Sequence, residues 1–319
     1  MYQFAITGLY QQVLGGEKLN QIEKTGELTS SRFTVRDFTE LVKIGIVNSN
    51  TITAFTGMWL AFQLNGISFI QNVDVIFFTI VGSALIVAAS GAFNNVIDRD
   101  IDGIMERTKN RPTMTGKISG KRALMVALVL GVVGTIMLFM TTWQAGVLGV
   151  IGVFLYVVVY SLYAKRKLVS NTVIGSFSGA VPPLIGWFAV EPSFSIVPIM
   201  LFLVMFCWQP PHFYAIAIKR KEEYAAAGIP MLPVVKGIER TKKSMFFWVI
   251  LLTVLPFFMF DLGLVYVILA TLLNIGWLAL SIYGFKMNDS IKWAKWMFVY
   301  SLNYMTILFV AMVVISIFL

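Results

Sequence analysis

The stretch Asn94–Pro112, N-N-V-I-D-R-D-I-D-G-I-M-E-R-T-K-N-R-P, gathers charged and amide side chains directly after the apolar run Val75–Phe93. Asn94, Asp98 and Asp102 follow one another at four-residue steps. On a helix each such step turns the side chain by only about 40°, so all three lie on one face. The pattern predicts a helix that leaves an apolar environment and presents three oxygen-bearing side chains together.

An amide oxygen and two carboxylates are hard ligands of the kind that Mg²⁺ takes, with water and substrate phosphates completing its shell. The residues therefore indicate a metal site, from which Asp100 is excluded because it lies on the opposite side of the helix. Three basic side chains follow within three turns and could hold phosphate oxygens. They are Arg107, Lys109 and Arg111. A solvated charged loop between two helices is the alternative, since turns rich in Asp and Arg are common.

Composition places the chain in a membrane. Hydrophobic residues make up 58% of the 319 residues and charged residues 13%, and the mean hydropathy is +0.80. So much apolar surface predicts an all-α polytopic membrane protein. Cys207 and His212 are the only cysteine and the only histidine, which excludes a disulfide framework and a multi-histidine metal centre. We expect no removable signal peptide in the first forty residues.

Two regions are predicted: a cytoplasmic tail at residues 1–38, ending in a short interfacial helix near Phe33–Leu41, and a transmembrane domain at residues 39–319. About nine helices of nearly the 20 residues needed to cross a bilayer should form a bundle around a central cavity. The seventh and eighth meet at Asp261 and could form one re-entrant unit. The expected spans are residues 41–64, 73–94, 122–140, 144–163, 172–190, 195–217, 244–260, 262–284 and 296–318.

The distribution of charge predicts the orientation. With a cytoplasmic amino terminus, all 25 Lys and Arg residues fall in or at the edges of the tail and four loops on the same side. The loops of the opposite side carry acids and no bases, as the positive-inside rule requires. The net charge of +9 is thus explained by topology, and we expect no nucleic-acid partner.

A second candidate region begins with W-Q-P-P-H-F at Trp208–Phe213. Pro210 and Pro211 cannot donate backbone hydrogen bonds, so the sixth span is predicted to kink or unwind there. His212 follows at a depth where an unpaired polar ring would be costly, and it is either a substrate-binding residue or a satisfied structural one.

Charged residues continue beyond this motif, and ordinary positive-inside flanking is the alternative explanation for them, accepted for Arg220. They are Lys219, Arg220, Lys221, Glu222 and Glu223. Pro182 and Pro183 are predicted to interrupt the fifth span, and the two broken helices indicate a cavity in the bundle. Small residues just before them should let helices approach closely. These are Gly175, Ser176, Ser178, Gly179 and Ala180.

The motif N-x-x-x-D-x-x-x-D at residues 94–102 resembles that of the intramembrane prenyltransferases of the UbiA superfamily. Three further motifs, A-V-P-P-L-I-G-W, W-Q-P-P-H-F and A-G-I-P-M-L-P-V-V, resemble those of the protohaem IX farnesyltransferase family within it. The resemblance runs from about residue 40 to the end of the chain. It implies an enzyme of a bacterial plasma membrane that joins the farnesyl group of farnesyl diphosphate to the 2-vinyl group of haem B. Water addition would give haem O, with diphosphate as the leaving group and Mg²⁺ as cofactor.

The resemblance also implies roles for single residues. Asn94, Asp98 and Asp102 would form the first metal–diphosphate motif, and His212 would contact haem. Membrane lipid and the next enzyme of haem A synthesis are candidate partners. The other implied substrate-binding residues are Arg107, Lys109, Arg111, Lys165, Lys219, Lys221 and Glu223.

The sequence departs from the superfamily pattern in the loop after the sixth span, which lacks a second Asp-rich motif. Either Glu223 makes a second metal contact there, or Lys219 and Lys221 hold the diphosphate. A quinone or chlorophyll-type prenyltransferase is an alternative function, and a transporter with broken helices is another.

Overall fold

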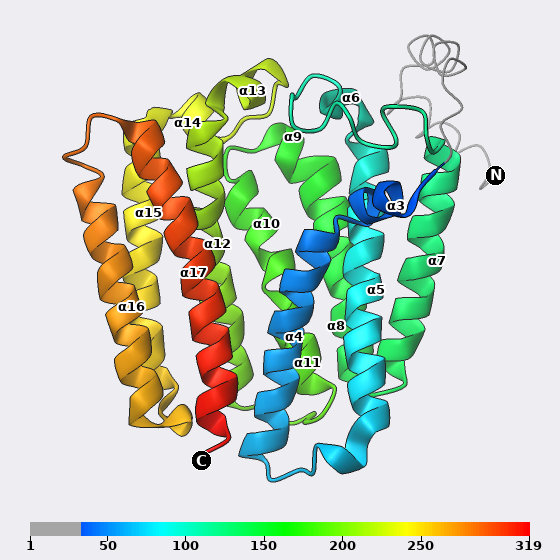
Figure 1. Cartoon of the computed structure of the whole chain (residues 1–319), viewed down its shortest axis with the longest axis vertical. Helices are drawn as coiled ribbons and strands as arrows, with labels where there is room; N and C mark the ends of the chain where they lie inside the picture. The colour runs from blue at the N-terminus through cyan, green and yellow to red at the C-terminus, as the bar shows by residue number, and fades with distance from the viewer. Residues whose placement is uncertain (1–32) are drawn as a thin grey trace.

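The computed structural model describes residues 33–319, and that part of the chain contains helices and no strand. The helices of the bundle run side by side, as Figure 1 shows. They are α4 (Ile44–Leu64), α5 (Val73–Ile97), α7 (Gly120–Phe139), α8 (Trp143–Phe154) with the π-helix η3 (Leu155–Ala164), α10 (Asn171–Gly179), α11 (Val181–Phe188), α12 (Ile196–Lys219), α15 (Gly237–Val254), α16 (Gly263–Tyr283) and α17 (Ser290–Ser316).

Short helices gather at one end of the bundle, and the carboxyl terminus lies at the other (Figure 1). We call the first the charged end, because the loops rich in Lys, Arg, Asp and Glu lie there. Its short helices are α3 (Val35–Val42), α6 (Arg99–Asp102), α9 (Lys165–Lys167), α13 (Lys221–Ala226) and α14 (Leu232–Val235). The expected cytoplasmic tail, residues 1–38, falls largely outside the described residues.

Among residues 33–319, seven helical segments are long and apolar enough to cross a membrane. The other two expected spans correspond to α4, whose first turns carry Asn48, Ser49 and Asn50, and to the pair of short helices α10 and α11. The all-α membrane bundle is thus confirmed, and the count of nine spans stays a prediction. The seven segments are Ile70–Ile97, Gly120–Phe139, Trp143–Lys167, Ile196–Lys219, Gly237–Phe258, Phe260–Tyr283 and Ser290–Ser316.

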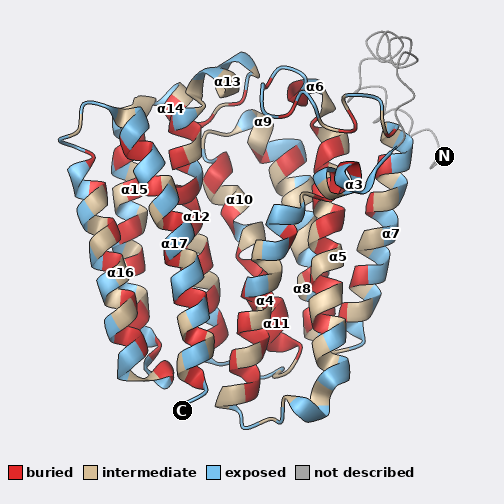
Figure 2. Ribbon diagram, viewed as in Figure 1, coloured by how far each residue is buried: buried red, intermediate tan, exposed pale blue. Residues whose placement is uncertain are grey.

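The outer surface of the bundle is apolar. Figure 2 shows exposed positions along the outward faces of the helices, and on α7 these positions include Leu128, Val132 and Ile136. Large aliphatic side chains exposed on several helices would be unfavourable in water but are favourable against lipid chains. The protein is therefore a multi-pass membrane protein.

The two proline pairs behave differently. Pro182 and Pro183 lie in the first turn of α11, where a missing backbone N–H costs little, and the fifth span is interrupted before them at Ala180. Pro210 and Pro211 lie inside α12, which stays helical from Ile196 to Lys219. The predicted interruption of the fifth span is confirmed. Of the kink or unwinding predicted for the sixth span, the unwinding is wrong, and the kink stays a prediction.

Glycines let the helices approach closely, as predicted. A Cβ atom on Gly175 would lie 2.9 Å from the Tyr160 ring, and one on Gly179 would lie 2.1 Å from the Gln209 side chain. Between α4 and α11 the backbones themselves touch, because a Cβ on Gly186 would lie 1.8 Å from the Ala54 carbonyl oxygen. Such contacts give a membrane bundle van der Waals packing that lipid cannot supply.

The predicted short helix before the first span is present as α3, at Val35–Val42. Thr34 caps it by accepting a hydrogen bond from the backbone N–H of Asp37, whose carboxylate in turn accepts from Thr34. Lys117 reaches Asp37 at 2.7 Å. The hydrogen bonds from Lys117 and Thr34 lower the pKa of Asp37 to about 2. This ion pair ties α3 to the loop before α7.

We predict that the charged end faces the cytoplasm. Reporter fusions after Gly116, Gly237 and Asn288 should report a cytoplasmic location, because the basic loops stay on that side. Fusions after Asn65, Glu191 and Leu319 should report the opposite side. A cytoplasmic carboxyl terminus would contradict the nine-span arrangement.

Candidate active site

The end of α5 and the short α6 carry the predicted metal motif at the charged end. Asp98 lies between the two helices, and the backbone bonds Asp98 N to Asn94 O (2.9 Å) and Asp102 N to Asp98 O (2.8 Å) keep helical spacing. Asn94, Asp98 and Asp102 are all buried, whereas the Asp100 side chain is 55% exposed. The predicted one-face arrangement is therefore present.

Asn94 links three separate segments. Its amide nitrogen donates to the Asp98 carboxylate at 2.7 Å and to the Ser161 hydroxyl of η3 at 3.1 Å. Its amide oxygen accepts a hydrogen bond from the Lys43 ammonium group. Because the amide serves as donor and acceptor at once, its orientation is fixed.

Lys43 occupies the corner between α3 and α4 and is the one non-glycine residue with a positive φ among residues 33–319 (φ 57°). The corner lies against α5 because Gly91 has no side chain: a Cβ there would lie 2.5 Å from the Val42 carbonyl oxygen. Asn95 also donates to the Leu41 carbonyl at 2.7 Å. The left-handed conformation is unfavourable for a residue with a Cβ, and the surrounding contacts hold it.

The Asp98 carboxylate is fully buried and faces two cations. The Lys165 ammonium group forms an ion pair with its Oδ2 atom, and the Arg166 guanidinium lies 3.7 Å from its Oδ1 atom. Oδ1 has no hydrogen-bond partner anywhere in the described chain. A buried carboxylate oxygen without a donor is an available ligand for a metal ion.

Asp102 forms an ion pair with Arg111. Burial raises the pKa of Asp102, and the Asp98 charge adds to this effect while Arg111 opposes it. The raised pKa of Asp102 thus reflects mainly its removal from water. A divalent cation bound there would stabilise both carboxylates in their charged forms.

Asp100 belongs to a different contact. Its two carboxylate oxygens accept hydrogen bonds from the two terminal nitrogens of Arg166, at 2.6 and 2.8 Å. Burial alone would raise the pKa of Asp100, but these hydrogen bonds lower it. Arg166 also donates to the Ile97 carbonyl at 2.8 Å, so this pair fixes α9 against the end of α5.

The donors fit Mg²⁺ by their chemistry. Within residues 33–319 no three His, Cys, Asp or Glu side chains form a complete metal site. Two carboxylates and one amide supply part of an oxygen coordination shell, and one of the carboxylate oxygens, Asp98 Oδ1, has no hydrogen-bond partner among the described residues. Mg²⁺ commonly completes such a shell with substrate phosphates.

The other predicted basic residues of the first loop are not joined to this cluster. Arg107 is exposed, and Lys109 forms an ion pair with Glu106 at 2.6 Å. Arg111 is the only one of the three predicted basic residues that contacts the carboxylates. Both exposed side chains belong to the same loop and remain free to turn toward an anion.

The second charged loop meets the first through apolar contacts. Ile101 and Met105 pack in one cluster with Ile229 and Met231. Lys219 is exposed and Lys221 half-buried, and neither is ion-paired among the described residues. Glu223 is paired at 2.8 Å with Arg220, a residue for which sequence alone predicts only positive-inside flanking. Its second oxygen, Oε2, is buried without a partner.

His212 lies between α12 and α17. Its ring stacks on Trp208 with centroids 4.5 Å apart and lies 5.0 Å from the Phe298 ring. Its Nδ1 atom is 2.8 Å from the Ser301 hydroxyl oxygen. No contact joins His212 to the carboxylate cluster in the described part of the chain.

The hydrogen bonds of Ser301 determine the tautomer of His212. The Ser301 hydroxyl donates its proton to the Phe298 carbonyl at 2.6 Å, so its oxygen must accept from His212 Nδ1–H. The lone pair of the neutral ring is then on Nε2, which has no hydrogen-bond partner among residues 33–319. A histidine whose Nδ1–H is held and whose Nε2 is free is arranged as a metal ligand usually is.

Sequence reasoning missed four residues of these networks. Arg166 and Lys165 share the motif Y-A-K-R-K, so the same signal could have identified both. The hydroxyl of Ser161 lies four residues before Lys165, which places it on the same side of that segment. Nothing local in the sequence marks Lys43 or the pairing of Arg220. The missed residues are Lys43, Ser161, Arg166 and Arg220.

Comparison with known proteins places this arrangement in a family. A model of the UbiA prenyltransferase family matches residues 50–303. A protoheme IX farnesyltransferase of Listeria innocua is 99% identical over 301 residues, covering 94% of this chain and all of that protein. The chain belongs to the UbiA prenyltransferase family and, within it, to the protoheme IX farnesyltransferases. It is therefore a transferase enzyme.

More distant relatives agree. A protoheme IX farnesyltransferase of a Geobacillus species is 56% identical over 289 residues, covering 91% of this chain and 94% of its own. The solved structure of a UbiA homologue from Archaeoglobus fulgidus, bound to DMAPP and Mg²⁺, has a TM-score of 0.60 at 16% identity, covering 87% of this chain and 99% of that one. The second comparison shows a shared fold.

The geometry predicts unequal effects for three neighbouring carboxylates. Asp98→Ala or Asp102→Ala should lower prenyl transfer about 100-fold or more, because each removes a buried charge that faces the reaction site. Asp100→Ala should be milder, because it removes only the pair with Arg166. The rates should be measured in membranes that contain equal amounts of each variant. Equal losses at Asp98 and Asp100 would contradict the one-face arrangement.

Proposed function

We propose that the protein transfers the farnesyl group of farnesyl diphosphate to the 2-vinyl group of haem B, giving haem O and diphosphate. One observation carries the proposal. Oxygen atoms that can bind a metal ion and basic side chains that can bind phosphate lie together at one end of an apolar bundle. The names of the highly identical relatives indicate that the acceptor is protohaem IX and that the prenyl group is farnesyl.

Mg²⁺ would be held by the oxygens of Asn94, Asp98 and Asp102. When bound, it supplies positive charge to the diphosphate as the carbon–oxygen bond breaks. Asp98 Oδ1 supports this assignment because it is buried without a partner, and the raised pKa of Asp102 supports it because burial and the neighbouring Asp98 disfavour its charged form.

The reaction has three bond changes. The allylic carbon–oxygen bond breaks and its electron pair leaves with the diphosphate. The allylic carbon joins the terminal carbon of the vinyl group, which leaves a cation next to the porphyrin ring. Water adds to that carbon and loses a proton, which gives the hydroxyl group of haem O.

The basic side chains act on the leaving group. Lys165 and Arg111 each touch one of the carboxylates, and Lys43 touches Asn94. Diphosphate oxygens that approach the cluster therefore meet fixed cations, which stabilise the charge that develops as the bond breaks. Arg107 and Lys109 border the same loop and would steady the departing diphosphate. Across the contact between the two loops, Lys219 and Lys221 would hold diphosphate oxygens.

A role for Glu223 as a second metal contact is supported by its buried, unpartnered Oε2 atom. The Arg220 pair holds the other oxygen and thereby orients the carboxylate. Glu223 lies on α13, in the loop whose apolar side chains pack against the first loop.

His212 would bind haem through Nε2. An imidazole nitrogen is a strong axial ligand of haem iron, and a hydrogen bond at the other ring nitrogen increases its basicity. Ser301 supplies that hydrogen bond, and the Trp208 and Phe298 rings fix the plane of the imidazole.

The product identifies the reaction. Purified protein in lipid, given haem B, farnesyl diphosphate and Mg²⁺, should yield a haem whose mass equals haem B plus a farnesyl group and a hydroxyl group. Asp98→Ala membranes serve as the control. A prenylated quinone in place of a prenylated haem, when both acceptors are offered, would contradict the proposal.

We predict that His212→Ala weakens binding of haem B and shifts the Soret band of the bound haem, because an axial nitrogen is lost. Binding of farnesyl diphosphate should be largely kept. Ser301→Ala is the matched variant, since it removes only the hydrogen bond to Nδ1, and it should weaken haem binding less. Absorption titrations with haem B measure both. An unchanged spectrum with weaker binding would indicate a propionate contact, and no change in either would remove His212 from the site.

A further inference from the structure

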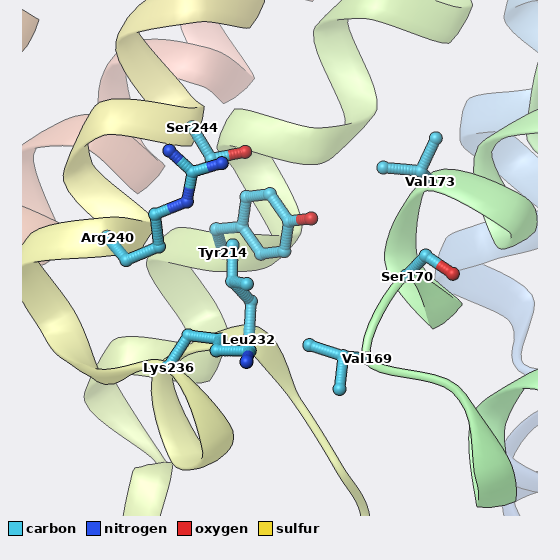
Figure 3. Close-up of a pocket in the computed structure, with 8 residues that line it drawn as sticks. All are labelled: Val169, Ser170, Val173, Tyr214, Leu232, Lys236, Arg240 and Ser244. Atoms are coloured by element: carbon cyan, nitrogen blue, oxygen red, sulfur yellow. The ribbon is translucent and has the colours of Figure 1, made fainter.

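A cavity of about 310 Å³ opens at the charged end, and no residue of the carboxylate cluster lines it. Figure 3 shows Lys236 and Arg240 on one side of it, Val169, Ser170 and Val173 on the other, and the Tyr214 ring between them. The lining residues come from the start of α10, from α12, and from α14 and α15. The rest of the lining is Leu232 and Ser244.

The charge of this cavity is positive. Lys236 and Arg240 are both exposed, and neither has an ion-pair partner in residues 33–319. Arg240 and Ser244 are four residues apart on α15 and so share one face, and Lys236 is the residue directly before that helix. The one acid nearby on this helix, Glu239, is paired with Lys242 at 2.9 Å. No carboxylate lines the cavity, so an anion would meet two cations and no opposing charge.

Below the cavity the same three helices present aromatic side chains. One helical turn from Val173 lies Phe177, and one turn from Ser244 lies Trp248. The Phe177 and Phe206 rings are 4.6 Å apart, Phe202 stacks on Phe206 at 5.9 Å, and Phe206 meets Trp248 edge-on at 5.6 Å. An apolar surface therefore continues from the polar cavity toward the middle of the bundle.

This apolar surface faces outward. Phe177 is 44% exposed and Phe247, on the α15 face below the cavity, is 53% exposed. Large exposed aromatic side chains at this depth contact lipid chains. The polar cavity and the apolar aromatic surface are thus continuous, and together they form one amphipathic surface on the membrane-facing side of the bundle.

We propose that this site binds an acidic phospholipid. The phosphate lies between Lys236 and Arg240, Ser170 and Ser244 provide hydrogen-bonding hydroxyls for the headgroup, and an acyl chain lies along Phe177 and Phe206. Both cations attract the single negative charge of a phosphodiester at a membrane surface. A diphosphate does not fit as well, since it requires the oxygen ligands for a metal that only the other site offers.

The test compares lipid binding by native mass spectrometry, with the full chain released from an equal mixture of phosphatidylglycerol and phosphatidylcholine. The wild type should retain phosphatidylglycerol. A double variant, Lys236→Gln with Arg240→Gln, should bind it about 30-fold more weakly, since each basic side chain near an anionic surface contributes about fivefold. Lys243→Gln is the matched control: it is exposed on the same helix, does not line the cavity, and should bind as the wild type does.

A second variant tests the contact between the aromatic surface and the acyl chain. Phe177→Ala should weaken phosphatidylglycerol binding while leaving the affinity for inorganic phosphate unchanged, because it removes only apolar contact. Thermal unfolding should be unchanged in the double variant, whose side chains are exposed and unpaired.

Three results would overturn the proposal. One is full retention of phosphatidylglycerol by the double variant. Another is loss of haem B affinity without loss of lipid, which would assign the cavity to the haem propionates. The third is displacement of the lipid by inorganic phosphate together with no effect of Phe177→Ala, which would mark a simple anion site.

Discussion

Two carboxylates are buried at the end of a membrane-spanning helix, and the arrangement of the charged end follows from the need to compensate them. Leaving one such charge unpaired would cost about 3 to 5 kcal/mol. Asp98 draws cations from a segment 67 residues away, Asp102 pairs with an arginine nine residues on, and each cation fixes the place of its own segment. These are Lys165 and Arg166 of α9 and Arg111 of the first loop, while Lys43 of the α3–α4 corner holds Asn94 beside them.

The metal motif could be predicted because its information is local. Four-residue spacing after an apolar run determines both the helix and the shared face, and Asp100 fell outside it as expected. Lys43 could not be predicted in this way. Its contact spans 51 residues and depends on a left-handed corner that Gly91 alone makes room for. The Arg220–Glu223 pair was missed for a different reason, since an arginine beside a membrane span is what topology alone would place there.

In the fold, too, some features could be predicted from local sequence and others depend on distant contacts. Hydropathy predicted the helices because lipid imposes one rule on every outward face. It could not decide what two prolines do, because identical pairs have different effects at different positions. Pro182 and Pro183 start a helix, while Pro210 and Pro211 lie in α12, the most buried of the apolar helices. Neighbouring helices on several sides hold α12 in helical form despite its missing hydrogen bonds.

The contact of His212 with Ser301 has a consequence for the order of assembly during synthesis. The histidine is made 89 residues before the serine that fixes its tautomer, and the same serine's carbonyl accepts from Trp208 at 2.8 Å. Ser301 belongs to α17, which is synthesised after α12 and after every helix between the two. A nascent chain that has inserted every earlier helix still lacks the Ser301 hydroxyl that fixes the tautomer of the His212 imidazole. The Trp208–His212 segment of α12 therefore reaches its final hydrogen bonds only after α17 has packed against it.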